Sequence, residues 1–235
     1  MMKEMIKGKI FLAEERGLNE TDWFSSQNTF NFGKYFNEHK SPFGDLYVLN
    51  DDMLAGSRSL SMLVEDHGYV ILLPLAGAIK YKYQKKADVL IAAGQLHIQF
   101  INAGERFEIV NPFKEDTVNF LQIWIKADKK DDLNIGALTF EDLNSKINEL
   151  IKLFPGNVFA EESSFSISIG KFSGRGETIH KPKLNSSFLF VINGAFEIEG
   201  RLLHERDGLA LYNANEIEME ALSNDAIILL IELTI

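Results

Sequence analysis

The sequence predicts a mainly β protein built from two antiparallel β-barrels that are joined by a linker with a short helix. Most apolar residues lie in short runs, either alternating or wholly apolar, that end at Gly, Asn or Asp, as is typical of strands and turns. The two halves of the chain share a pattern, and a single segment has helical spacing. A small barrel removes the open edges of many short strands by closing on itself.

Eight segments have the composition and length of strands or of strand pairs. Each is bounded by turn-forming residues, and two of the longer ones contain Gly-Ala at the point where the chain would reverse. The segments are residues 44–50, 69–83, 88–94, 118–127, 164–173, 186–200, 207–213 and 225–235. They occur in both halves of the chain, so we expect β structure in each half.

The two halves also resemble each other in detail. "PLAGAIKYKY" at 74–83 and "VINGAFEIEG" at 191–200 both contain an apolar strand, then Gly-Ala, then an alternating strand. "GQLHI" at 94–98 and "DGLAL" at 207–211 each open a further strand. A repeat much longer than a solenoid unit of about 20 to 50 residues indicates duplication of a whole domain.

The segment "LTFEDLNSKINELIKLF" at 138–154 has the spacing of an amphipathic helix, with Thr139 as a candidate N-cap and Pro155-Gly156 as the end. Its apolar face would consist of Leu143, Ile147, Leu150, Ile151 and Phe154. The charged stretch at 126–134 precedes it as a linker. We therefore expect a first barrel at 1–126, a linker with the helix at 127–155, and a second barrel at 156–235.

Composition excludes several classes of function. The chain has no Cys, which rules out disulfides, thiolate metal sites and Cys nucleophiles. A formal net charge of −10 argues against nucleic acid and against anionic membrane surfaces, which both attract basic proteins. The N-terminus lacks the pattern of a signal peptide, and no run reaches the roughly 18 apolar residues of a membrane span. We expect a cytoplasmic protein.

One short stretch resembles a metal site. "LVEDHGY" at 63–69 contains two carboxylates and an imidazole, and Glu65 and His67 would share a face of a regular strand. Glu105, Glu108 or His97 would have to complete such a ligand set. The five histidines include no closely spaced ligand pair, and the chain has no G-x-S-x-G or Walker A motif.

Residues 23–52, "WFSSQNTFNFGKYFNEHKSPFGDLYVLNDD", resemble the opening segment of pirin-like proteins, and "FLQIWI" at 120–125 is similar to a further strand of that family. The resemblance continues through the Gly-Ala block and the last strand of the second half. It implies a bicupin, in which two jelly-roll barrels of the cupin type follow one another. The first barrel of the family normally holds an iron-like metal through three His and one Glu, and some bacterial members are similar in activity to quercetin dioxygenases.

The resemblance also implies where the metal ligands would lie. Counted without gaps from Gly77-Ala78, the first two histidine places fall on Leu63 and Glu65, and a second block places the other two ligands at Phe107 and Ile109. Leu, Phe and Ile supply no lone pair to a metal, and one carboxylate does not hold an iron-like ion. We expect Leu63, Phe107 and Ile109 to close the core.

Glu65 would then reach solvent or find a partner such as Arg106 or His67, since an unpaired buried carboxylate is costly. The sequence thus predicts a degenerate pirin-like bicupin without metal, cofactor or catalytic residues, which is not an active metal-dependent dioxygenase. It would bind a small molecule or a protein partner, as a monomer or homodimer. The alternatives are a quercetin-dioxygenase-like metalloenzyme with replacement ligands and a structural role in assembly. Candidate pocket residues are Leu63, Glu65, His67, Tyr69, Phe107 and Ile109.

Overall fold

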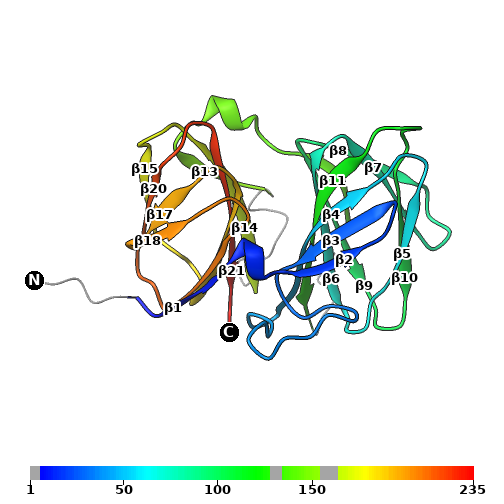
Figure 1. The fold of residues 1–235 in the computed structure, drawn as a ribbon, viewed down its shortest axis with the longest axis horizontal. Helices are drawn as coiled ribbons and strands as arrows, with labels where there is room; N and C mark the ends of the chain where they lie inside the picture. The colour runs from blue at the N-terminus through cyan, green and yellow to red at the C-terminus, as the bar shows by residue number, and fades with distance from the viewer. Residues whose placement is uncertain (1–5, 128–133, 154–163) are drawn as a thin grey trace, which may run out of the picture. The chain divides into compact units, whose positions relative to one another are not determined.

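A computed structural model describes residues 6–127, 134–153 and 164–235, and it is mainly β with antiparallel strands (Figure 1). The chain forms two compact units. The contiguous unit is Gly17–Phe140, and the split unit combines Met1–Arg16 with Glu141–Ile235. The split unit therefore contains the first residues of the chain, an association that the predicted boundaries at 126 and 155 do not include.

The contiguous unit consists of a seven-stranded and a four-stranded sheet. The large sheet has the order β12-β9-β6-β11-β4-β3-β2, and the small sheet has the order β5-β10-β7-β8. The strands are β2 Gly17–Glu20, β3 Phe24–Asn28, β4 Leu46–Leu54, β5 Ser59–Leu63, β6 Gly68–Ala76, β7 Ala78–Tyr83, β8 Val89–Ala92, β9 Gln95–Ile101, β10 Arg106–Val110, β11 Val118–Lys126 and β12 Asn134–Thr139.

The split unit consists of a six-stranded and a four-stranded sheet. Their orders are β1-β19-β16-β21-β14-β13 and β15-β20-β17-β18. The strands are β1 Gly8–Phe11, β13 Glu149–Lys152, β14 Phe165–Phe172, β15 Glu177–His180, β16 Ser186–Asn193, β17 Phe196–Ile198, β18 Arg201–Leu203, β19 Gly208–Tyr212, β20 Ile217–Ala221 and β21 Ala226–Leu233.

The two units repeat one topology, as the sequence repeat predicts. The order β9-β6-β11-β4 in the contiguous unit corresponds to β19-β16-β21-β14 in the split unit, and the four-stranded sheets correspond strand by strand. Gly77 and Gly194 occupy matching turns after β6 and β16, with φ values of 78° and 79°. Most residues with a side chain are strained in that left-handed conformation, so the turn requires the Gly of each Gly-Ala block.

The core of each unit lies between its two sheets. In the contiguous unit, Val48, Trp124 and Phe120 of the large sheet pack in one apolar cluster with Phe107 and Ile109 of the small sheet. A second cluster joins the sheets of the split unit. Strand pairing among the described residues keeps the sheets of each unit separate, so the predicted closed barrels are not confirmed.

Strand β1 completes the large sheet of the split unit. It pairs antiparallel with β19, from Gly8 opposite Leu211 to Phe11 opposite Gly208. The Phe11 ring lies 5.5 Å from that of Phe188, centroid to centroid, and the following Ala13 N–H donates to Asp207. Figure 1 shows this blue strand within the part of the ribbon that runs from yellow to red.

The helix predicted over 138–154 is wrong for the described residues of that segment. Two strands, β12 and β13, lie here on either side of a single-turn 3-10 helix, Leu143–Ser145. Asn148 has a φ of 67°, which ends any helix, and β13 pairs with β14. The other 3-10 helix of the described residues is Ala13–Glu15, and no helix in these ranges is long and apolar enough to cross a membrane. Phe154, Pro155 and Gly156, like most of the charged linker, lie outside the described residues.

Candidate functional site

Strands β5 and β10 build the region in which the sequence places the candidate residues. Phe107 on β10 stands opposite Met62 on β5 and Tyr83 on β7, and Ile109 stands opposite Leu60 and Tyr81. Phe107 is 2% exposed and Ile109 is 0% exposed. Because side chains alternate along a strand, both residues point into the core between the sheets. The prediction that Phe107 and Ile109 close this core is confirmed.

Leu63 does not close the core, in contrast to the prediction. It is 40% exposed and stands opposite Arg106, so it lies on the outer face of the small sheet. The neighbouring Met62 packs against the core, and Val64 is 0% exposed. The inward places next to Phe107 are therefore held by Met62 and Val64. The gap-free count from Gly77-Ala78 gives Leu63 and Glu65 instead, which is an error of one residue at each place.

Glu65 and His67 lie in the short connection between β5 and β6, and both are exposed. Glu65 thus reaches solvent, as one of the two alternatives predicts. Tyr69 is buried, but it lies on the face of β6 opposite to Val70, and its ring packs edge-on against Phe100 at 5.4 Å. Tyr69 therefore does not face the interior that Phe107 and Ile109 line.

The residues proposed for a replacement metal site are not brought together. The described residues contain no group of three or more His, Asp or Glu side chains that fits a metal ion. Glu105 accepts a hydrogen bond from the Tyr83 hydroxyl, and Glu108 forms an ion pair with Lys82 at 3.2 Å. His97 is buried on β9, with its ring 4.2 Å from that of Tyr81. Burial lowers the pKa of His97 to about 4, so the ring is neutral at pH 7.

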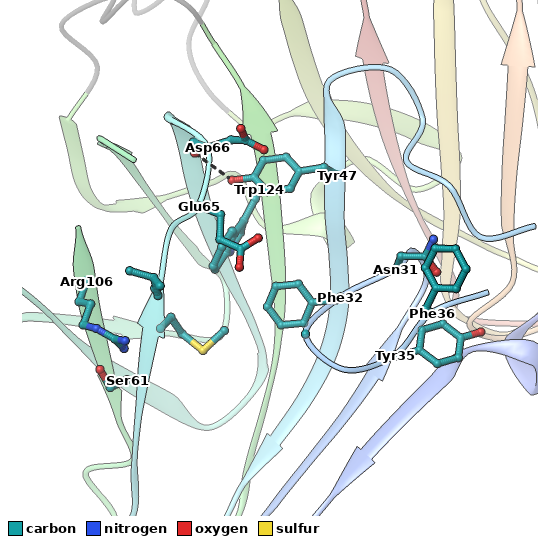
Figure 2. A pocket seen from close by; sticks show the side chains of 13 residues that line it. Asn31, Phe32, Tyr35, Phe36, Tyr47, Ser61, Glu65, Asp66, Arg106 and Trp124 are labelled. Atoms are coloured by element: carbon teal, nitrogen blue, oxygen red, sulfur yellow. Dashed lines mark hydrogen bonds between the residues drawn. The ribbon is translucent and has the colours of Figure 1, made fainter. Parts of the chain in front are cut away.

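An open pocket of about 450 Å³ lies beside this filled core (Figure 2). Two of the predicted pocket residues, Leu63 and Glu65, line it. His67, Tyr69, Phe107 and Ile109 do not. The complete lining is Asn31, Phe32, Gly33, Tyr35, Phe36, Tyr47, Ser61, Met62, Leu63, Glu65, Asp66, Arg106 and Trp124.

Trp124 joins the pocket to the core. Its ring packs edge-on against Phe32 at 5.6 Å and Tyr47 at 5.9 Å on the pocket side, and against Phe107 at 5.7 Å in the core. Edge-to-face packing of this kind fixes ring positions. Phe36, in contrast, is 80% exposed at the pocket rim. The pocket therefore has a fixed aromatic floor and an exposed aromatic side chain at its edge.

The acidic corner of the pocket is partly neutralised. Asp66 forms an ion pair with Lys126 at 2.7 Å, and its backbone carbonyl accepts a hydrogen bond from the Tyr47 hydroxyl at 3.2 Å. Burial, and then the negative charges of Asp66 and Glu65, raise the pKa of Tyr47 far above its usual value. Tyr47 is consequently a neutral hydrogen-bonding group at any physiological pH.

A buried polar chain behind the pocket has no counterpart in the predicted site. The Trp124 indole N–H donates to Gln122 Oε1 at 3.3 Å, and Gln122 Nε2 donates to Asp52, which is 0% exposed. Burial raises the pKa of Asp52 to about 7, against the opposing hydrogen bonds from Ser26 and Gln122. Alternation would have revealed it, since Val48, Asn50, Asp52 and Leu54 share the inward face of β4.

Sequence comparison finds proteins that are similar to this chain, some of them over most of its length. The family profile described as quercetinase C-terminal cupin domain matches residues 162–233. Quercetin 2,3-dioxygenase of Escherichia coli (strain K12) is 21% identical over 233 residues, which is 92% of this chain and 95% of that protein. The pirin-like protein YhaK of the same strain is 24% identical over 115 residues, covering 49% of each chain.

Solved structures share the fold. YhhW from Escherichia coli superposes with a TM-score of 0.85 at 20% identity, covering 97% of each chain. The bacterial pirin YhhW in complex with nickel(II) gives a TM-score of 0.76 at 19% identity, over 97% of this chain and 100% of that one. Two facing antiparallel sheets in each unit, together with these likenesses, define the cupin fold. More narrowly, the chain is similar to pirin-like cupin proteins.

Proposed function

We propose that this protein is a degenerate pirin-like cupin that binds a small organic molecule in the open pocket of its contiguous unit, without metal catalysis. One observation carries the proposal. An apolar core fills the place where the resemblance implies a metal, while a pocket with aromatic and charged groups opens directly beside it. Binding in this pocket requires no metal ion.

The side chains around the implied metal position do not fit an iron-like ion. Met62, Val64, Phe107 and Ile109 face one another there. Only the thioether of Met62 has a lone pair, and it is a soft ligand, whereas iron in such sites takes imidazole and carboxylate ligands. Glu65, the remaining carboxylate of the predicted ligand places, is exposed outside the core. We therefore derive no reaction step through a metal.

The pocket itself has the properties of a small-molecule site. Its volume of about 450 Å³ falls within the range of roughly 300 to 1,000 Å³ that is typical of ligand pockets. Its floor is formed by the rings of Trp124 and Phe32, and Glu65 and Arg106 add charged groups to its lining. Aromatic walls with a few polar groups are the usual composition of such sites. A protein partner would instead be favoured by a broad apolar surface.

The proposal is tested by elemental analysis of protein purified without chelators, combined with a binding screen of aromatic small molecules by ligand-observed NMR. We expect no stoichiometric transition metal, and binding that EDTA does not change. A Phe32→Ala substitution should weaken any binding, while Phe113→Ala, an exposed Phe outside the pocket, should not. Stoichiometric iron, nickel, manganese or zinc that depends on Glu65 would contradict the proposal, as would a complete lack of binding.

A quercetin-dioxygenase-like metalloenzyme with replacement ligands is the second candidate, favoured by the similarity to the Escherichia coli quercetin 2,3-dioxygenase over most of both chains. Oxygen consumption with a flavonol and added Fe(II) or Ni(II) would test it. If this candidate is correct, the protein consumes oxygen and the Glu65→Ala substitution lowers the rate. If the protein is a degenerate cupin, the rate of oxygen consumption equals that of buffer containing the metal alone.

A further inference from the structure

The charged groups of the pocket differ in whether they are already neutralised. Asp66 is paired with Lys126 at 2.7 Å. The side chains of Glu65 and Arg106, however, form no ion pair or hydrogen bond within the part of the chain that the structure describes. The pocket therefore contains one uncompensated negative charge and one uncompensated positive charge, both exposed to solvent.

Both of these charges lie on the same wall. Arg106 stands opposite Leu63 in the pairing of β10 with β5, and Glu65 follows Leu63 by two residues. Figure 2 shows the Arg106 side chain extending toward Ser61 and the Glu65 carboxylate extending in another direction, toward the side on which Phe32 lies. The pocket thus presents a carboxylate and a guanidinium group at separate places.

The aromatic side chains of Phe32, Tyr35 and Phe36 lie across the pocket from this charged wall. Figure 2 shows Phe32 opposite Glu65, with Tyr35 and Phe36 farther out on the same side. Packing against Trp124 holds Phe32 in place. A ligand that reached both charges would have one flat face against Phe32 and the floor of the pocket. An aromatic ring fits such a surface better than a flexible alkyl chain, because rings pack edge-on or offset against one another.

We propose that the pocket binds an aromatic zwitterion, with an ammonium group at Glu65, a carboxylate at Arg106 and the ring against Phe32 and Trp124. This inference rests on the proposed function. A simple cation would gain from Glu65 but would approach Arg106, and a simple anion would meet the reverse arrangement. A molecule with both charges meets an opposite charge at each end. The carboxylate at Arg106 can also be held by two parallel N–H donors.

Isothermal titration calorimetry with three probes of the same ring tests the inference: tyrosine, tyramine and 3-(4-hydroxyphenyl)propionate. Tyrosine has both charges, tyramine has only the ammonium group, and the propionate has only the carboxylate. We expect tyrosine to bind about tenfold more tightly than either of the other two. In Glu65→Gln, tyrosine should bind no better than the propionate. In Arg106→Gln, it should bind no better than tyramine.

Matched controls come from the same unit. Glu115→Gln and Arg58→Gln remove one charge of each sign from exposed residues outside the pocket, and both should leave the affinity for tyrosine unchanged. Thermal denaturation of all four variants establishes that each is folded. A loss of binding in the controls equal to that in the pocket variants would overturn the inference, because net charge alone would then explain it.

Two further results would overturn the inference. If tyramine or the propionate bound as tightly as tyrosine, the ligand would not need both charges, and the inferred zwitterion would be wrong. The proposed metal-free binding of an organic molecule would still stand. If none of the three probes bound up to about 1 mM, the inference would be wrong as well. The proposed function is judged separately by the metal analysis and the aromatic screen, so its failure is distinguishable from failure of this inference.

Discussion

Asp52 is the residue at which burial and charge conflict most directly. It is 0% exposed on the inward face of β4, with a hydrogen bond from Gln122. Burial raises its pKa from 3.8 to about 7, and the neighbouring charge of Asp51 adds to the effect. The folded protein therefore holds the Asp52 proton over a pH range in which the unfolded chain has released it. This difference destabilises the folded state as the pH rises.

An Asp52→Asn variant should remove this pH dependence. Between pH 4 and 7 the folded wild-type protein binds more protons at this site than the unfolded chain, so its contribution to stability falls as the pH rises and is constant above about 7. The stability of the variant relative to wild type should increase over that range, by at most about 1.4 kcal/mol per pH unit. Urea denaturation of both proteins at several pH values measures it. A difference that does not vary with pH would contradict the raised pKa.

The inward and outward residues of the β5–β10 pair can be distinguished by truncation. Phe107→Ala removes a 2% exposed ring from the core and should lower the free energy of unfolding by about 3 to 5 kcal/mol. Leu63→Ala removes a side chain that is 40% exposed and should cost less than about 1 kcal/mol. Equal costs in chemical denaturation would mean that Leu63 lies in the core, as the gap-free count predicts.

At the scale of single residues, the sequence predicts which residues face the core only where the strand is regular. Phe107 and Ile109 are correctly expected in the core because they lie on a short regular strand. The core-facing residues Met62, Val64, Val70 and Leu72 keep one parity through the connection to β6. The count that misplaces Leu63 starts at Gly77-Ala78 and passes the end of β6, where the pairing with β11 shifts register between Asn119 and Phe120. Such irregularities exchange inward and outward residues and leave little trace in composition.

At the scale of elements, strands were easier to predict than the segment that connects the units. All eight strand-like segments contain strands, because each has turn-forming residues at its ends. The apolar spacing of Leu143, Ile147 and Leu150 matches a helix, yet the structure has the strand β13 here. Its partner β14 is the next strand in the chain, and such tertiary pairing overrides local propensity.

Strand β1 is the element whose contribution is most readily measured. Phe11 is 3% exposed and packs on Phe188, whereas the adjacent Ile10 is 37% exposed. Phe11→Ala should therefore lower the stability of the split unit by about 3 kcal/mol or more, and Ile10→Ala should have a much smaller effect. Both Trp residues, Trp23 and Trp124, belong to the contiguous unit. Far-UV circular dichroism should thus report a shift in Phe11→Ala that Trp fluorescence does not. An equal shift in both signals would contradict an effect confined to the split unit.

At the scale of the whole molecule, the two units differ in how the chain supplies them. Residues 17–140 contain every strand of the contiguous unit. Residues 141–235 contain all strands of the split unit except β1, so this segment alone leaves an edge of β19 unpaired. An unpaired edge of this kind is a template for association with other chains.

Fragments should show this difference. We expect residues 17–140 to fold alone, with dispersed amide signals in an NMR spectrum. Residues 141–235 should be poorly folded or aggregated, and addition of a peptide of residues 1–16 should restore dispersed signals. A peptide with Phe11→Ala should restore them less well. If residues 141–235 were fully folded without any peptide, β1 would not be needed for this unit.

The pairing of β1 with β19 also affects biosynthesis. The ribosome makes Gly8–Phe11 well before Gly208–Tyr212. The contiguous unit can therefore complete its sheets while β1 still has no partner. During that interval an apolar strand with Phe11 remains exposed, and it is accessible to chaperones and to neighbouring nascent chains. A strand that is synthesised before the other strands of its sheet is thus one of the last to reach its place in that sheet.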